Sequence, residues 1–150
     1  MPTLATNKYA RFSYTIIDDF EAGIVLTGPE VKSMKLGQVN FKGSYVSIHE
    51  GKPVLVNLHI SPYVPAKSVQ KHYKPTRTRT LLLNKKEIDS LVGKSASQGL
   101  TLIPLTVYTK GSFIKLKIGI GRGKKKADKR EAIKKRDTDR NIRRALKRNI

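Results

Sequence analysis

Alternating apolar and polar positions predict that much of the chain before residue 124 forms β strands. The clearest run has an apolar residue at every second position: Ile114, Leu116, Ile118 and Ile120. Lys115 and Lys117 fall between them, and successive side chains of a strand point to opposite faces. Phe12, Tyr14 and Ile16 alternate with polar residues in the same way. We therefore expect half-buried strands, each with one apolar and one polar face.

Short turns and capping pairs organise these strands. Glycine-containing turns predict two hairpins, which join 45–49 to 54–60 and 100–108 to 113–120. Two short helices are predicted where a small polar residue precedes a glutamate by three positions and a glycine follows: Thr27 with Glu30 before Gly37, and Asn84 with Glu87 before Gly99. About five or six strands with two short helices predict a mainly β fold, a small closed barrel of the oligonucleotide-binding type.

The charge of the chain indicates its partner. There are 31 Lys and Arg against 11 Asp and Glu, a net charge of +20. Like charges repel in the compact state, so this surplus points to a polyanion, and nucleic acid is the usual one. The longest apolar stretches, such as 24–26 and 81–83, are far shorter than the roughly 20 residues of a spanning helix. Without a secretory signal at the start, we expect a cytoplasmic protein that binds RNA and no membrane.

Positive charge is densest at the C-terminal end. Residues 124–150 hold 13 Lys and Arg and 4 Asp and Glu, a net of +9, while residues 1–123 carry the other +11. Large apolar residues are scarce after Ile120, so this end cannot bury enough surface to offset its ordering entropy. We expect an RNA-binding body over 1–123 and a basic tail over 124–150, disordered when free and helical on binding.

No residue pattern indicates catalytic or metal chemistry. His49, His59 and His72 lack metal-ligand spacing, and cysteine is absent. Glycines 119, 121 and 123 miss both phosphate-loop spacings, so we interpret them as a flexible joint between body and tail. We expect no catalytic residue, no metal, no cofactor and no small-molecule substrate.

The acidic cluster of Asp18, Asp19 and Glu21 allows two interpretations. Neighbouring carboxylates can serve a hydrolase or hold the metal ions of a nuclease. An acidic residue on an RNA-binding surface can instead accept hydrogen bonds from bases. Aromatic rings would add stacking on bases, and the candidates are Tyr9, Tyr45, Tyr63 and Tyr73.

A series of segments in fixed order carries a family resemblance. They are NKYAR (7–11), FEAG (20–23), GPEVKS (28–33), SYV (44–46), HISPY (59–63), RTRTLLL (77–83), GLTLIPL (99–105) and GKKKADKR (123–130). Together they resemble the small protein B family, the SsrA-binding proteins that partner bacterial transfer-messenger RNA, over residues 7–146. The resemblance implies an oligonucleotide-binding barrel that binds the tRNA-like domain of this RNA and helps deliver it to stalled 70S ribosomes, the process called trans-translation. It also implies a tail that probes the empty mRNA channel and decoding centre, with elongation factor Tu as a further candidate partner.

The resemblance also assigns roles to individual residues. Asn7, Glu21 and Leu82 match family positions linked to RNA binding, although Leu82 fits a core role equally well. Phosphate contacts are expected from basic side chains of the body: Lys8, Arg11, Lys32, Arg77 and Arg79. Contacts with ribosomal RNA are expected from the tail: Lys124, Lys125, Asp128, Lys129, Arg130, Ile133, Lys134 and Arg136. Ala127 stands where relatives often carry a histidine or tyrosine, so stacking at that position is not expected here.

Two alternatives fit the composition as well. One is a basic structural ribosomal protein, and the other is an RNA-processing enzyme that uses the acidic cluster. The ordered segments favour a member of the small protein B family over both alternatives, because neither alternative requires them.

Overall fold

The computed structural model describes residues 2–124, without the side chains of 67–69 and 95–98. Several predictions concern residues of the tail that lie outside the described range. They are the conformation of the tail, the lack of stacking at Ala127 and the RNA contacts of Lys125, Asp128, Lys129, Arg130, Ile133, Lys134 and Arg136. The predicted boundary falls where the described strands end, because the last strand reaches Gly123.

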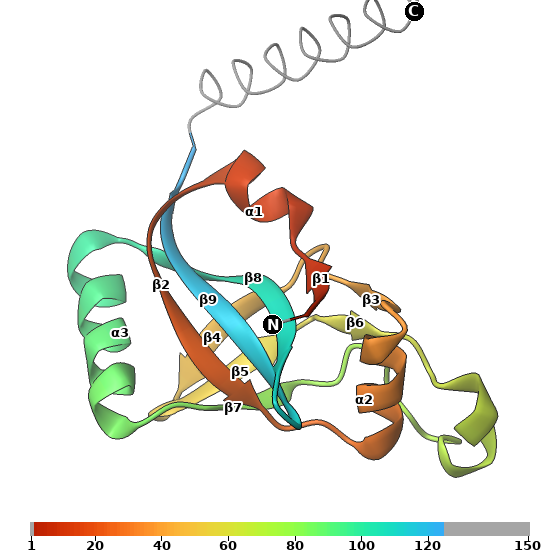
Figure 1. The fold of residues 1–150 in the computed structure, drawn as a ribbon. Helices are drawn as coiled ribbons and strands as arrows, with labels where there is room; N and C mark the ends of the chain where they lie inside the picture. Colours follow the sequence, from red (N-terminus) through yellow and green to blue (C-terminus); the bar gives the residue numbers. More distant parts are fainter. Residues whose placement is uncertain (1, 125–150) are drawn as a thin grey trace, which may run out of the picture.

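The described residues form nine strands and four short helices (Figure 1). The strands are β1 Thr3–Thr6, β2 Tyr14–Ile24, β3 Val39–Asn40, β4 Tyr45–His49, β5 Lys52–Val56, β6 His59–Ile60, β7 Arg79–Leu82, β8 Thr101–Lys110 and β9 Phe113–Gly123. The helices are α1 Lys8–Ser13, α2 Gly28–Lys35, the 3-10 helix η1 Val64–Val69 and α3 Lys85–Gln98. Seven strands make one antiparallel sheet in the order β1-β8-β9-β2-β7-β5-β4, and β3 pairs with β6.

The mainly β class is confirmed, but the prediction of a closed barrel is wrong. The sheet curls until β4 lies beside β8. In the described part of the chain, however, its edge strands β1 and β4 are not joined to each other by a ladder. The front strands β8, β9 and β2 and the back strands β5 and β4 therefore enclose the core as an open, strongly curved sheet (Figure 1).

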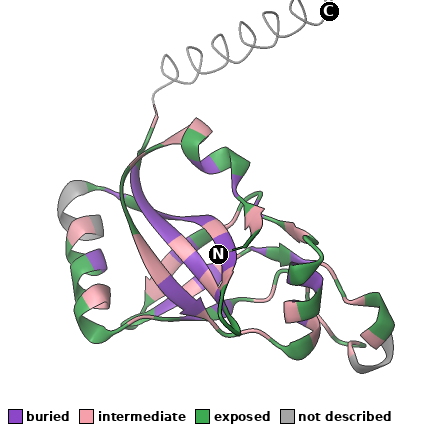
Figure 2. Ribbon diagram, in the orientation of Figure 1, coloured by how far each residue is buried: buried purple, intermediate pink, exposed green. Residues whose placement is uncertain are grey.

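The core lies on the concave side of this sheet, and β9 shows the predicted alternation. Its inward residues are buried: Ile114, Leu116, Ile118 and Ile120. Lys115 and Lys117 lie between them on the outer side and are only partly buried. Buried residues gather along the middle of the sheet, while the helices and turns around it are mostly exposed (Figure 2).

Both helix predictions that rest on capping pairs are confirmed. Thr27 and Glu30 exchange side-chain and backbone hydrogen bonds of 2.9 and 3.4 Å at the start of α2. Asn84 and Glu87 do the same at the start of α3, and Gly99 ends that helix in the left-handed region with φ of 62°. These caps involve residues three positions apart, so the local sequence alone specifies them.

Two strand predictions are wrong at their ends. Phe12 lies in α1, not in a strand, because Asn7 caps a helix there by accepting a hydrogen bond from the Tyr9 backbone at 3.1 Å. The predicted strand 54–60 is split into β5 and β6, because Asn57 has a φ of 63° and turns the chain.

The glycines near the end of β9 are packing positions and not the predicted flexible joint. A Cβ atom at Gly119 would come within 2.9 Å of the Leu105 side chain. At Gly121 it would come within 2.7 Å of the Thr15 carbonyl oxygen. Both distances are shorter than real contacts allow, so glycine lets β9 approach its neighbours here. Of the three glycines, only Gly123 has open space around it.

Candidate nucleic-acid interface

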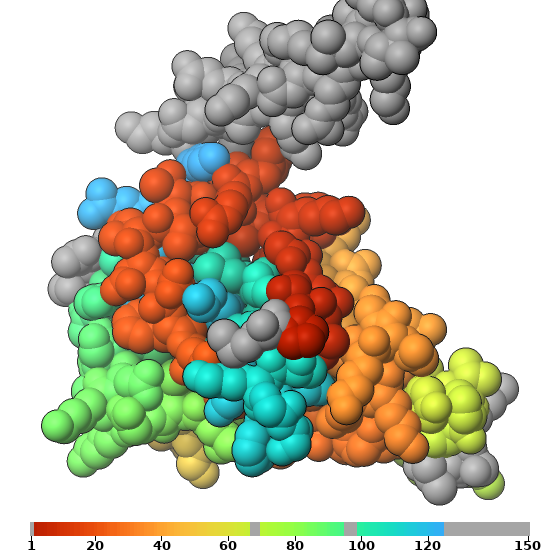
Figure 3. Space-filling model, viewed as in Figure 1, coloured from red at the N-terminus to blue at the C-terminus, as the bar shows by residue number. Residues whose placement is uncertain are grey.

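Strand pairing brings residues far apart in the sequence onto one convex surface. Gly23 of β2 pairs with Leu82 of β7 on one side and with Lys115 of β9 on the other. Directly paired residues point to the same face of a sheet, and neighbouring pairs extend this row. We call the resulting surface the outer face; its members are Glu21, Leu82, Tyr108, Lys110, Phe113, Lys115 and Lys117. The space-filling view shows residues of β8 and β9 at the surface between β2 and β1 (Figure 3).

Glu21 is held on the outer face by groups from β8. The Tyr108 hydroxyl reaches across β9 and donates a hydrogen bond to Glu21 Oε2. Lys110 Nζ lies 3.2 Å from Glu21 Oε1. The Tyr108 hydrogen bond, helped by Lys110, lowers the pKa of Glu21 against the opposing effect of burial. Burial and the Glu21 carboxylate together raise the pKa of Tyr108.

The consequence is an oriented carboxylate on a basic surface. The side chain of Glu21 remains 33% exposed. Each carboxylate oxygen can accept more than one hydrogen bond, so Glu21 can receive the amino group of a base without losing Tyr108. The predicted acceptor role fits this geometry.

Leu82 is exposed and does not belong to the core. Leu81 is buried at 2% exposure, whereas Leu82 is 60% exposed, as the alternation of β7 requires. Leu82 borders a cleft of about 310 Å³ whose lining is mainly apolar and includes Ile24, Leu26 and Phe113. The alternative of a core role for Leu82 is therefore wrong, and the side chain is free to pack against a partner.

The acidic cluster does not converge on a metal or reaction centre. Asp18 lies 3.5 Å from Lys94, and Asp19 lies 3.8 Å from Lys117. Glu21 is bound by Tyr108 and Lys110, as described above. No group of three potential metal ligands occurs among residues 2–124. Each carboxylate thus has a separate cationic partner, an arrangement that gives no support to a nuclease.

Arg79 is placed in the interior, where it cannot contact a phosphate. Its exposure is 0%, and its Nη2 and Nε atoms lie 2.5 and 2.9 Å from Glu30 Oε2. It also donates to the carbonyl oxygens of Leu58 and Pro75. The prediction of a phosphate contact for Arg79 is wrong, because its charge is already neutralised and its donors are occupied.

Glu30 is the centre of this buried group, which we call the Glu30 network: Glu30, Tyr73, Arg77 and Arg79. Arg77 Nη2 lies 2.5 Å from Glu30 Oε1, and its side chain stays 36% exposed. Burial tends to raise the pKa of Glu30, but hydrogen bonds from Arg77, the Thr27 backbone and Arg79 outweigh it and lower the pKa to about 2. Burial and the Glu30 charge raise the pKa of Tyr73 to about 12. The network ties α2 to β7 and to the loop after β6.

Asn7 also has an internal role. It is 7% exposed, and its Nδ2 donates to the Pro104 carbonyl at 2.7 Å while its Oδ1 caps α1. Both functional groups of the side chain are therefore used inside the protein, and direct RNA recognition by Asn7 does not fit. Asn7 instead fixes α1, which presents Lys8 and Arg11 to solvent.

A second surface with aromatic and basic groups lies beside α1. Tyr9 is 51% exposed and Tyr45 is 46% exposed, and both line a groove of about 480 Å³ together with Lys42 and Lys124. We call this the α1 groove. Tyr14, at the start of β2, also lines this groove, whereas Gly23, near the end of β2, lines the cleft beside Leu82. The two surfaces are therefore separated by roughly 30 Å of extended chain. The structure thus divides the predicted RNA-binding residues between separate places.

The remaining predicted stacking residues differ in exposure. Tyr63 is partly buried and has Lys32 Nζ 5.4 Å from its ring centre, a cation–π contact. Tyr73 is committed to the Glu30 network through its hydroxyl, 3.1 Å from Glu30 Oε2. Of the four tyrosines named from the sequence, Tyr9 and Tyr45 are therefore the best placed to stack on a base.

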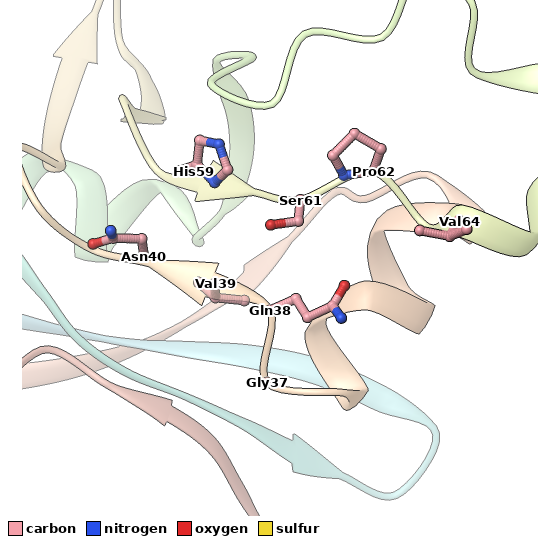
Figure 4. A pocket seen from close by; sticks show the side chains of 8 residues that line it. All are labelled: Gly37, Gln38, Val39, Asn40, His59, Ser61, Pro62 and Val64. Carbon is pink, nitrogen blue, oxygen red and sulfur yellow. The ribbon is translucent and has the colours of Figure 1, made fainter. Parts of the chain in front are cut away.

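A further depression in the described part of the chain contains no predicted site residue. It measures about 750 Å³ and lies between β3, β6 and the segment leading into η1. Its lining side chains include Gln38, Asn40, His59, Ser61 and Val64 (Figure 4).

Sequence reasoning missed five residues of the outer face as site residues: Tyr108, Lys110, Phe113, Lys115 and Lys117. The outward position of Phe113 could have been predicted from the sequence. Phe113 is two and four positions before Lys115 and Lys117 and so lies on the same side of β9, whereas the even-numbered residues point inward. The role of Tyr108 could not have been predicted in this way, since its partner Glu21 is 87 positions away.

A curved antiparallel sheet that presents aromatic rings and lysines on its convex side is typical of β proteins that bind single-stranded nucleic acid. Comparison with known proteins makes the assignment specific. The family model described as SmpB protein matches residues 4–148. The chain belongs to this family.

Relatives and a solved structure agree with this membership. An SsrA-binding protein of Microcystis aeruginosa is 49% identical over 145 residues, which cover 97% of this chain and 94% of the relative. An SsrA-binding protein of Leuconostoc mesenteroides is 51% identical, covering 96% and 92%. A chain of the solved structure "tmRNA-SmpB: a journey to the center of the bacterial ribosome" is 40% identical with a TM-score of 0.68, covering 89% of this chain and 95% of that one. Within residues 2–124, no helix is both long and apolar enough to cross a membrane.

Proposed function

We propose that the chain is the protein partner of transfer-messenger RNA in trans-translation. It binds the tRNA-like domain of that RNA and helps deliver it to ribosomes stalled without a codon. The observation that carries the proposal is the outer face, where pairing of β2 with β7 and β9 joins an oriented carboxylate, an exposed Leu82 and several lysines. Family membership and the relatives' description as SsrA-binding proteins support it.

The outer face would read bases, and other basic residues would hold the backbone. Glu21 and Leu82 are the proposed base contacts. Lys8, Arg11, Lys32 and the exposed part of Arg77 supply proposed phosphate contacts, which set position and not sequence. Asn7 acts through the placement of α1, and Arg79 through the Glu30 network.

Residues 124–150 would act as a separate tail that enters the mRNA channel and contacts ribosomal RNA near the decoding centre. Its net charge of +9 supports this role, because such a segment gains affinity by releasing counterions from RNA. The proposed site of action is the cytoplasm, and elongation factor Tu is a further candidate partner. The protein would act by binding and not by catalysis.

Selective RNA binding tests this function. The purified chain is titrated with its host's tRNA-like domain and with an unrelated structured RNA of equal length at physiological salt. Salt must be controlled because a chain of +20 binds any RNA when salt is low. A large preference for the tRNA-like domain is expected. Equal affinity for both RNAs would contradict the proposal and favour a basic structural ribosomal protein.

Deleting 124–150 tests the division between body and tail. The described core lies before residue 124, so the truncated chain should fold and retain most of its selective binding. Peptide tagging on stalled ribosomes should be lost, because the segment proposed to enter the mRNA channel is missing. If selective binding fell as far as tagging, the proposed division would be wrong.

A further inference from the structure

Two large apolar side chains stand exposed on opposite sides of one cleft of the outer face. Phe113, the first residue of β9, is 68% exposed, and Leu82 of β7 is 60% exposed. Both line the cleft of about 310 Å³ over the end of β2. Exposed apolar side chains gathered around a cleft are a feature of binding sites, whereas single ones are common everywhere on protein surfaces.

The floor of the cleft is kept open by Gly23. This residue pairs with Leu82 and with Lys115, so it lies between the strands that carry the two apolar walls. A Cβ atom at position 23 would lie 3.1 Å from Leu82 Cβ and would press on that side chain. Glycine therefore preserves a gap beside Leu82 that any larger residue would begin to fill.

The lysines around the cleft favour an anionic ligand, and the exposed ring of Phe113 favours a flat one. Lys115 Nζ lies 5.8 Å from the centre of the Phe113 ring, and Lys110 is paired directly with Phe113 across the hairpin. Glu21 lies on the same face, two residues before Gly23 and so roughly 7 Å along β2. An unpaired nucleotide fits all three features, since it has an apolar ring face, polar groups at the ring edge and a phosphate on either side.

We propose that the cleft between Leu82 and Phe113 holds one unpaired base of the bound RNA. Phe113 stacks on the base and Leu82 packs against it from the other wall. Glu21 accepts a hydrogen bond from the polar edge of the base, and Lys110 and Lys115 neutralise the adjoining phosphates. This assignment rests on the proposed function for the identity of the RNA, and it adds Phe113 as a residue that determines affinity.

Substitution of Phe113 tests the assignment with the full chain and the tRNA-like domain. Phe113→Ala should weaken binding by about 5- to 150-fold, the loss associated with one base–aromatic stack. Phe113→Trp should bind as tightly as the native chain. Leu36→Ala is the matched control, because Leu36 is similarly exposed at 63% but lies at the end of α2, and it should have no effect. The dependence of affinity on salt should not change with Phe113→Ala, since no charge is removed.

The bound base can be located by replacing the unpaired purines of the tRNA-like domain one at a time with 2-aminopurine. Fluorescence at one position should be quenched by the native chain and by Phe113→Trp, and not by Phe113→Ala. Unchanged affinity of Phe113→Ala would overturn the assignment while leaving the proposed function intact, provided the native chain still prefers the tRNA-like domain. Unchanged affinity together with lost tagging would show that the cleft contacts a protein instead. Absence of that preference in the native chain would refute the proposed function itself.

Discussion

The outer face and the Glu30 network use the same chemical groups in different surroundings. On the outer face Glu21 accepts hydrogen bonds from Tyr108 and Lys110 and keeps a third of its side chain exposed. In the network Glu30 accepts from Tyr73, Arg77 and Arg79 and is 1% exposed. Buried charges must be satisfied internally. Burial, not residue type, therefore separates the carboxylate that stabilises the fold from the one that is exposed on the candidate RNA-binding surface.

The largest expected effect is on stability, from Glu30→Ala. This change leaves Arg79 as a buried charge without its carboxylate partner, which typically costs about 3–5 kcal/mol. Urea denaturation followed by circular dichroism would measure it. Glu87→Ala is the matched control, because Glu87 holds the same capping position in α3 but is exposed to solvent on one side, and we expect a loss of about 1 kcal/mol. Equal losses in both variants would contradict the assigned importance of the Glu30 network.

The next effect is on RNA selectivity, from Glu21→Ala. Losing a charged acceptor should weaken binding to the tRNA-like domain by roughly tenfold to a hundredfold. The denaturation midpoint should hardly move, because the side chain is at the surface. Asp89→Ala removes the same charge from the exposed side of α3 and should leave the preference intact. Tighter binding by Glu21→Ala would show that the outer face acts only through its positive charge.

Acid should distinguish the two regions through the pKa of Glu30. That pKa is about 2 in the folded chain against 4.5 for an ordinary glutamate, so the unfolded chain binds more protons between these values. The stabilisation from Glu30 is therefore complete above pH 4.5 and is lost as the pH falls towards 2. The stability difference between the native chain and Glu30→Gln should shrink over this window, as measured by urea denaturation at several pH values. A difference independent of pH would contradict the charged network.

The smallest effect is expected from Tyr108→Phe, which removes one hydrogen bond from Glu21. The pKa of Glu21 should rise towards 4.5, because the Tyr108 hydroxyl is the main cause of its lowering. NMR titration of the glutamate side chains would detect this rise. Affinity for the tRNA-like domain should fall roughly two- to tenfold, since the carboxylate is less well oriented. An unchanged pKa of Glu21 would refute the role of Tyr108 as a positioning residue.

Predictions from sequence succeeded where the signal is local. The caps of α2 and α3 and the alternation in β9 depend on residues within a few positions of one another, and all three were predicted. The prediction of α1 failed although its cap by Asn7 is also local, and the contacts of Asn7 with Pro104 and Leu105, which hold that cap in place, are distant in sequence.

The same limit applies to the candidate site. The resemblance identified Glu21 and Leu82, and the structure brings them onto one face. Arg79 was also expected to contact a phosphate, but it is buried beside Glu30, which lies 49 positions away in the sequence. A single sequence does not reveal such a pair, because an arginine or a glutamate considered alone is predicted to lie at the surface.

We infer that bound RNA covers the outer face. Lysine modification followed by mass spectrometry, with and without the tRNA-like domain, tests this most directly. We expect strong protection of Lys110, Lys115 and Lys117, and little change at Lys52, the exposed first residue of β5 next to the turn that follows β4. Unprotected lysines on the outer face, in a chain whose selective binding has been verified, would show that RNA binds elsewhere on the protein.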